Sequence, residues 1–358
     1  MRSIMNKLNI DTLKKLSNPI IAIIISLLLG VFLIIPTGES PLEVYKMLLV
    51  GSLGSRTSLY GTFAAATPLL FTGLAAAISF RAGVFNIGLE GQLYMGAMAS
   101  SLCGIYFSFL PSFILVPLCL IAALTAGAVW GYIPAILNVK LDVNIFLNCI
   151  MLNSVAQLFC NYLSAYPFKG ELPISATKKI GDNAYLPKLA GNMNDLNLGF
   201  IIAIIFAIII YVALFKTRFG YESRAAGISR IFSRYIGVDA AKKTIIIVMI
   251  SGAIAGLAGA ERILGVNHRY IADFSNGVGY TGIAVSLLAM HNPIGCVITA
   301  IFFGALESGA IQMEVMTNIS RDLVSSIEAI MIIFMAGTYS FSRLKNFLDK
   351  RKKEAVNA

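Results

Sequence analysis

Apolar segments long enough to cross a membrane recur along the whole sequence, and this feature constrains the fold more than any other. A transmembrane helix needs about 20 mostly apolar residues. Only 13% of the residues are charged, which is about half the fraction usual in soluble domains. We therefore predict an all-α polytopic membrane protein with about ten transmembrane helices (8–10), folded as a single transmembrane domain over residues 1–358. The predicted spans lie at 19–36, 62–80, 84–104, 114–137, 143–163, 199–215, 244–264, 279–290, 293–310 and 323–340.

Some of these spans are predicted to be broken or re-entrant. Segment 279–290 is too short to cross a membrane alone, and glycines interrupt the stretches 81–96 and 277–295. These two stretches occupy corresponding places in two four-span groups that enter the membrane from opposite sides. Such an arrangement is typical of inverted repeats, and we expect two of them. Glycine pairs spaced four residues apart predict close helix packing; they are Gly127 with Gly131 and Gly252 with Gly256.

The basic residues lie in a few connecting segments, and their distribution predicts the orientation of the chain. Cytoplasmic segments of membrane proteins are rich in Lys and Arg. This rule predicts that residues 1–18, 216–243 and 341–358 are cytoplasmic and that 164–198 lies outside. Both termini are then cytoplasmic, and the number of spans is even. The same clustering explains the net charge of +10, so we do not expect the protein to bind nucleic acid.

Residues 80–92 place polar side chains and glycines between two strongly apolar stretches. They read Phe-Arg-Ala-Gly-Val-Phe-Asn-Ile-Gly-Leu-Glu-Gly-Gln. Lipid tolerates broken backbone and ionisable groups only where protein or a water-filled cavity covers them. The segment therefore predicts a translocation path for a solute. Together with the second glycine-rich segment it supplies the candidate pathway residues Phe85, Asn86, Glu90, Gln92, Tyr94, Tyr280 and Thr281.

These residues also have a structural explanation, which the sequence leaves open. Glu90 can pair with backbone amides and so hold a kink in the chain. Asn86 and Gln92 can tie helices together by hydrogen bonds. Single aromatic residues such as Tyr94 can pack against neighbouring helices.

No other group of residues predicts a metal site, a cofactor or catalysis. The five cysteines are scattered through apolar segments, and the two histidines have no partner at metal-ligand spacing. The sequence contains no Gly-xxxx-Gly-Lys-Ser/Thr motif and no hydrolase constellation. We therefore predict that the chain is not an enzyme and has no ATPase site, metal or cofactor of its own. The charged residues before the second glycine-rich segment are expected to form interfacial ion pairs; they are Glu261, Arg262, Arg269 and Asp273.

The basic segment 216–243 has small residues, arginines and aromatic residues at helical spacing. This pattern predicts a short helix along the cytoplasmic surface that docks on a partner protein. Attraction of the basic side chains to anionic lipid headgroups explains the same charges. The charges alone do not decide between the two.

Residues 80–92 resemble the signature of ABC-transporter permeases for nucleosides and simple sugars, within the superfamily of branched-chain amino acid and ribose permeases. Two further blocks, 256–260 and 280–295, are similar to blocks of the same family. The resemblance covers the chain from about residue 62 onward. The basic segment departs from the family's pattern, because Ser229, Phe232-Ser233 and Val238 replace its Asn, Ala-Ala and Ile.

The resemblance implies a permease subunit of an ATP-driven importer in the bacterial plasma (inner) membrane, with nucleosides as the expected solutes. Its implied partners are a separate ABC ATPase that binds the ATP, a second related permease forming a heterodimer, and an extracellular solute-binding lipoprotein. The segment 216–243 would then be the coupling loop. The expected coupling residues are Glu222, Arg224, Gly227, Arg230, Arg234, Tyr235 and Gly237.

Two other functions stay open on the sequence. Simple sugars or branched-chain amino acids are alternative solutes of the same permease class. An ion-coupled secondary transporter is the alternative from another class, with Glu90 as a proton or ion relay.

Overall fold

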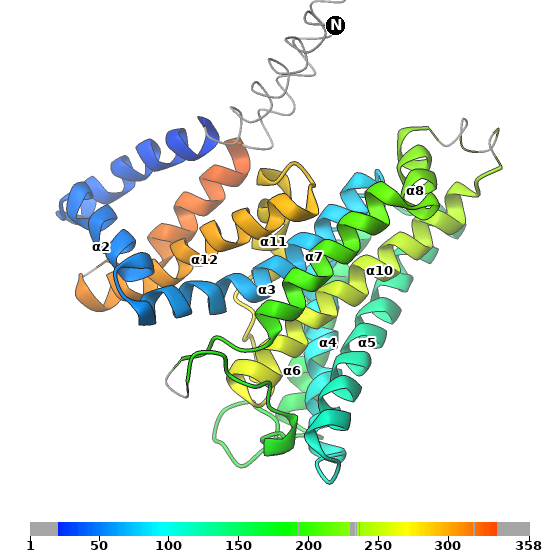
Figure 1. The fold of residues 1–358 in the computed structure, drawn as a ribbon, viewed down its shortest axis with the longest axis horizontal. Helices are drawn as coiled ribbons and strands as arrows, with labels where there is room; N and C mark the ends of the chain where they lie inside the picture. Colours follow the sequence, from blue (N-terminus) through cyan, green and yellow to red (C-terminus); the bar gives the residue numbers. More distant parts are fainter. Residues whose placement is uncertain are drawn as a thin grey trace, which may run out of the picture. The chain divides into compact units, whose positions relative to one another are not determined.

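The computed structural model describes residues 21–191, 194–229, 233, 235, 237–317 and 319–334, and these are mostly helical (Figure 1). A helix at 21–34 runs into η1 (Ile35–Thr37), and a last helix covers 322–334. The segments 1–18 and 341–358, together with Arg230 and Arg234, lie outside the described residues. The main helices are α2 (Pro41–Leu53), α3 (Arg56–Arg81), α4 (Leu89–Tyr106), α5 (Ser112–Leu141), α6 (Ile145–Ala165), α7 (Gly199–Lys216), α8 (Arg218–Ile228), α10 (Ala240–Glu261), α11 (Val278–Leu288) and α12 (Pro293–Met316).

The chain forms two compact units. The first comprises Met1–Gly51 and Gly309–Ala358, and the second comprises Ser52–Ser308. In the first unit, Tyr45 Oη donates a hydrogen bond to the carbonyl of Leu27 (2.6 Å) and so ties α2 to the helix before it. All the pathway residues and the basic segment belong to the second unit.

Six described helices are long and apolar enough to cross a membrane, which confirms a multi-pass membrane protein. They are α3, α5, α6, α7, α12 and the continuous helix Ala240–Asn267 that α10 forms with the π-helical turn η3 (Arg262–Asn267). A seventh span results if 21–37 and α2, which are bent by 114° at their junction, count as one. The short predicted segment 279–290 is confirmed as the 11-residue helix α11. The count of ten and the inverted repeats stay predictions.

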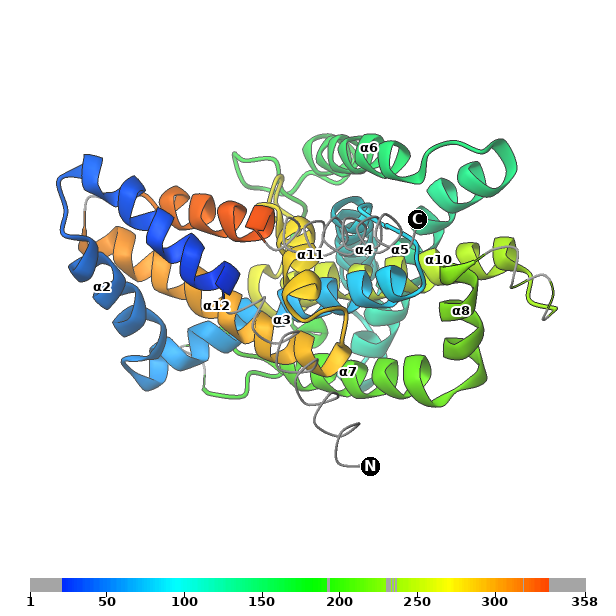
Figure 2. The same ribbon diagram turned by 90° about the horizontal axis from the view of Figure 1, so that it is seen from above.

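Helices α3, α4, α10 and α5 form the core of the second unit. Helix α10 packs against α5, α4 and α3, while α11 packs against α3. Figure 2 shows α6 and α7 on opposite sides of this group. Of the apolar window of α3, 83% is buried, against 22% for α6, so α3 is an interior helix and α6 presents most of its surface outward.

The predicted glycine pairs lie at the crossing of α5 and α10. A Cβ added to Gly127 would meet the backbone of Gly252, and one added to Gly256 would meet the backbone of Ala123. Gly96 brings α4 equally close to Gly256. The prediction of close helix packing is therefore confirmed, and it is backbone approach that requires glycine here.

Replacing Gly127 with Leu should destabilise the fold, because the two helix backbones must separate to admit the side chain. Overpacking of this kind costs about 1–3 kcal/mol or more. The measurement is the apparent melting temperature of the purified protein in detergent, which should fall by several degrees. Val129→Leu, on the exposed face of the same helix, is the control and should change it little. Equal melting temperatures for the two variants would show that the crossing of α5 and α10 can accommodate a larger side chain at Gly127.

Candidate functional site

The predicted broken segment is an interruption between α3 and α4. Helix α3 ends at Arg81, and the left-handed Gly83 (φ 73°) donates its N–H to the carbonyl of Phe80 (3.0 Å). This is the C-terminal geometry for which glycine is favoured. The chain then runs without helix until Gly88, and α4 begins at Leu89. A stretch of non-helical backbone thus lies between two helices of the second unit.

The side chain of Asn86 organises this interruption. Its Oδ1 accepts a hydrogen bond from the N–H of Gly88 (3.0 Å), and its Nδ2 donates to Ser251 Oγ on α10 (2.9 Å) and to Gln92 Oε1 (3.2 Å). Ser251 Oγ donates in turn to the carbonyl of Ala75 in α3 (2.6 Å). Asn86, Gln92 and Ser251 are fully buried. The network therefore joins α3, α4 and α10, as expected of carboxamides that tie helices together.

Glu90 lies between the N-termini of two helices. It is in the first turn of α4, and its Oε2 accepts the N–H of Gly279, in the first turn of α11 (2.7 Å). The partial positive charge of a helix N-terminus stabilises an anion. A Cβ at Gly279 would lie 2.6 Å from the backbone of Glu90, so this approach also requires glycine. The pairing of Glu90 with backbone amide is thus the arrangement in this structure.

Asn153 on α6 joins the same region, although the sequence analysis did not single it out. Its Oδ1 accepts the N–H of Gly91 (2.9 Å), and its Nδ2 donates to the carbonyl of Ile87 (3.0 Å) and to Tyr280 Oη (3.1 Å). Its signal in the sequence was the polar row Asn153, Gln157 and Asn161, which recurs every four residues and therefore marks one face of an otherwise apolar helix.

The aromatic candidates divide into exposed and buried residues. Phe85 is 47% exposed and stacks on Phe80, with ring centroids 4.2 Å apart. Tyr280 is 43% exposed, and Thr281 is half-buried. Tyr94 is only 2% exposed and packs against Phe274. Phe85 and Tyr280 are thus the pathway candidates with the largest accessible surface.

The prediction of ion pairs among the charged residues before α11 is wrong, because these residues bind other partners. Glu261 Oε1 accepts from Asn197 Nδ2 (2.8 Å), and Asp273 Oδ1 accepts from two amides of α6. Arg262 pairs instead with Glu307 on α12 (3.6 Å). Opposite charges lie close together along the sequence, but side-chain amides from distant parts of the chain bind the two carboxylates.

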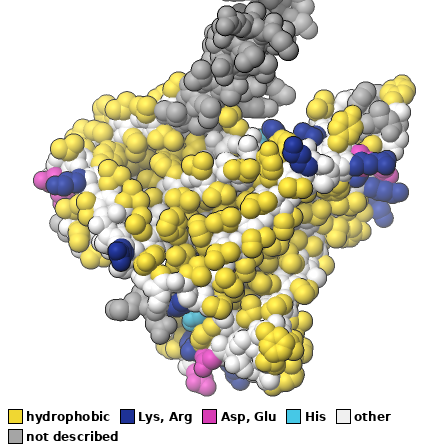
Figure 3. Space-filling view, in the orientation of Figure 1, with side chains coloured by type: hydrophobic (Ala, Val, Ile, Leu, Met, Phe, Trp, Pro, Cys, Tyr) yellow, Lys and Arg dark blue, Asp and Glu magenta, His cyan; other side chains and the backbone are white. Residues whose placement is uncertain are grey.

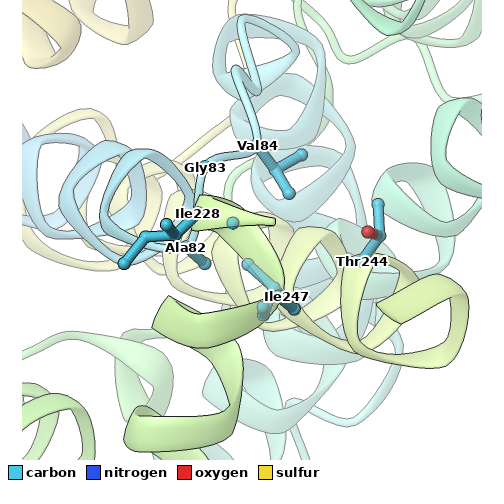
Figure 4. A pocket seen from close by; sticks show the side chains of 8 residues that line it. Ala82, Gly83, Val84, Ile228, Thr244 and Ile247 are labelled. Carbon is cyan, nitrogen blue, oxygen red and sulfur yellow. The ribbon is translucent and has the colours of Figure 1, made fainter. Parts of the chain in front are cut away.

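The predicted short helix in the basic segment is confirmed as α8, and it rests on the interruption. The backbone of Gly227 lies against that of Ala82 and Gly83 so closely that neither Gly227 nor Gly83 could carry a Cβ. A hollow opens beside this contact, and Figure 4 shows Ile228, Thr244 and Ile247 around it. Helix α8 therefore touches the turn through which the chain leaves α3.

Charged side chains hold α8 in place. Glu222 accepts from Arg218 Nε and from Lys243 Nζ at the start of α10, both at 2.7 Å. Donation from Lys243 and Arg218 lowers the pKa of Glu222, so these ties persist until the pH falls below the ordinary carboxyl range. The guanidinium groups of Arg81 and Arg224 lie 5.2 Å and 5.3 Å from the ring of Phe215. Of the other coupling candidates, Tyr235 is exposed and Gly237 has a φ of 76°.

No group of three potential metal ligands occurs among the residues that the structure describes. The five cysteines are buried and free. The described part of the site consists of amides, hydroxyl groups, aromatic rings, Glu90 and backbone N–H groups.

Comparison with known proteins gives relatives along nearly the whole chain. The chain is 35% identical over 353 residues to the guanosine ABC transporter permease protein NupP of Bacillus subtilis, covering 96% of this chain and 99% of that protein. It is 32% identical to the glucose permease TsgB13 of Haloferax volcanii, with 94% and 92% covered. It is also 32% identical to the nucleoside permease NupB of Lactococcus lactis, with 90% and 91% covered. No solved structure matches the chain significantly.

A family model agrees with these relatives. The family described as "Branched-chain amino acid transport system / permease component" matches residues 58–336. This range contains the interruption, the α8 contact and the segment around α11. The chain belongs to this family of ABC-transporter permeases, whose members are transport subunits.

Proposed function

We propose that this protein forms the translocation pathway of an ABC importer for nucleosides. The observation that supports it most is near-full-length similarity to a guanosine permease and a nucleoside permease. The similar identity to a glucose permease makes simple sugars the second candidate. The described pathway residues are rich in amides and aromatic rings and include no cluster of cations, which suits an uncharged polar solute such as a nucleoside better than a nucleotide.

The working transporter in this proposal has four kinds of subunit. An ABC ATPase binds the ATP, an extracellular lipoprotein delivers the solute, and a second permease pairs with this chain. Support for a heterodimer comes from the relatives, because two permeases of Bacillus subtilis, NupP and NupQ, both resemble this chain, at 35% and 31% identity. The assembly lies in the bacterial plasma (inner) membrane.

The proposed topology has ten spans, two inverted repeats and cytoplasmic termini. It places α8 and the loop 216–243 in the cytoplasm, where the ATPase docks. Figure 3 supports this placement, since Lys and Arg side chains gather at the α8 end of the second unit beside a broad apolar face.

In the proposed pathway, residues play two roles. Phe85, Tyr280 and Thr281 present surface to the solute. Asn86, Glu90, Gln92 and Tyr94 are buried and serve the pathway by holding the two interrupted segments in register. Because α8 touches the interruption at Gly83, movement of α8 by the ATPase acts on the turn that precedes these buried residues. The coupling surface comprises Glu222, Arg224, Gly227, Arg230, Arg234, Tyr235 and Gly237.

The function is tested by uptake into proteoliposomes that contain the complete importer. Radiolabelled guanosine should accumulate only with ATP and the binding lipoprotein, and a protonophore should leave uptake unchanged. Uptake of glucose in place of guanosine would favour the sugar permease. Guanosine uptake that does not require ATP but is abolished by the protonophore would favour the secondary transporter.

Glu90→Gln should slow uptake by about tenfold while leaving expression normal. The amide keeps the size of the side chain but removes the negative charge from two helix N-termini, an interaction worth up to about 2 kcal/mol. Glu43→Gln is the matched control, because Glu43 also lies in the first turn of a helix but is exposed. If Glu90→Gln lowers only the amount of folded protein, Glu90 has a purely structural role.

Arg224→Glu should uncouple ATP hydrolysis from transport. It removes the cation from the ring of Phe215 and places a carboxylate one turn from Gly220, where Arg224 Nε now donates to the carbonyl (3.2 Å). ATP hydrolysed per guanosine imported should rise severalfold. Lys216→Glu reverses an exposed charge of the same basic segment. Equal effects of the two variants would mean that the segment is a lipid anchor rather than a coupling surface.

A further inference from the structure

Asp273 precedes α11, and two amide side chains of α6 hold its carboxylate. Gln157 Nε2 and Asn161 Nδ2 both donate to Oδ1, at 2.6 Å and 2.9 Å. Asn161 Oδ1 accepts in turn from Tyr270 Oη (3.0 Å), which fixes the orientation of that amide. The hydrogen bonds found among the described residues use only Oδ1, so Oδ2 is available as an acceptor.

The carboxylate lies beside the body of α6 rather than at its end. Gln157 is eight residues before Ala165, the last residue of α6, so it lies about 12 Å from that helix end. Helix α6 is a candidate membrane span, and Asp273 is exposed. Among the described residues, no ion pair neutralises Asp273. Because lipid does not tolerate such a group, this face of α6 must border water or another protein chain.

The backbone around Asp273 is irregular. Asp273, Asn276 and Gly277 all have left-handed conformations, with φ of 57°, 48° and 83°. Such conformations cost free energy in residues other than glycine and collect at functional sites. Hydrogen bonds from Thr177 N to Tyr270 O and from Ala272 N to Ser175 O anchor the segment, both at 2.9 Å.

Tyr280 completes the surface next to Asp273. Its hydroxyl bonds to Asn153 Nδ2 (3.1 Å), and Asn153 lies one helical turn from Gln157 on α6. Residues four apart on a helix are neighbours, about 5–6 Å between Cβ atoms. An exposed aromatic ring, a carboxylate oxygen and the Gln157 amide carbonyl are therefore grouped on one face.

We propose that Asp273, with Gln157 and Tyr280, binds the transported solute through a pair of adjacent hydrogen-bond donors. This rests on the proposed function, and it adds residues and a chemical class to it. Carboxylate and carbonyl oxygens only accept hydrogen bonds, so their complement is a vicinal diol or two neighbouring N–H groups. The ribose of a nucleoside offers the first, and the guanine edge with N1–H and the 2-amino group offers the second. The carboxylate repels phosphate and thereby disfavours nucleotides.

The test is Asp273→Asn in the complete importer, measured as maximal uptake rate in proteoliposomes at saturating binding lipoprotein. Guanosine uptake should fall at least tenfold, since a hydrogen bond to a charged group is worth about 1.5–3 kcal/mol. Asp142→Asn is the matched control, because Asp142 has the same left-handed backbone (φ 54°) at the end of α5. It should keep the wild-type rate.

Two further solutes distinguish the source of the donors. If the diol binds, the variant loses the preference for guanosine over 2′,3′-dideoxyguanosine. If the guanine edge binds, it loses the preference for guanosine over inosine, which lacks the 2-amino group. Either pattern supports the proposal.

Three results would overturn it. If the Asp273→Asn variant takes up guanosine at the wild-type rate, this inference is refuted and the proposed function stands. Equal loss for all three nucleosides, together with loss of lipoprotein-stimulated ATP hydrolysis, would show that Asp273 is only structural. Absence of any nucleoside uptake by the wild-type importer would refute the proposed function and this inference with it.

Discussion

The hydrogen bond from the Gly279 N–H to Glu90 is the contact on which the site depends. A carboxylate in the interior of a membrane protein is costly unless it is paired. Here it is paired with backbone amide at the meeting point of two helix N-termini, those of α4 and α11. Both helices begin inside the second unit because the preceding backbone is irregular. The carboxylate of Glu90 therefore lies near the partial positive charge of both helix N-termini.

The surrounding helices pack closely on one side of this meeting point, and exposed residues lie on the other. Glycines bring α4, α5 and α10 into backbone contact, and Asn86 and Ser251 tie α3 to α10. On the α6 side, however, Tyr280 and Asp273 are exposed. Helix α8 touches the same interruption through Gly227. Helix α8 is therefore in backbone contact with the turn that leads into the packed helices.

The sequence predicted the helices and the broken segment well, because both depend on local composition. Membrane-length apolar runs, the glycine pairs and the short α11 could all be read from neighbouring residues. The partners of the polar residues could not. Glu90 and Gly279 are 189 positions apart, and a single sequence does not show which distant amide a carboxylate meets. For the same reason, Asp273 was assigned an arginine partner, whereas amides of α6 hold it. The helix α2 was missed because it adds no separate membrane-length apolar run.

The central claim is that two contacts persist throughout transport: the one between Glu90 and Gly279, and the one between Gly227 of α8 and Gly83. The most direct measurement is cryo-electron microscopy of the assembled importer in ATP-free and ATP-trapped states. The account predicts that the Glu90 Oε2 to Gly279 N distance stays within hydrogen-bonding range, below about 3.2 Å, and that Gly227 stays against Gly83 in both states. Separation of either contact in one state would contradict it.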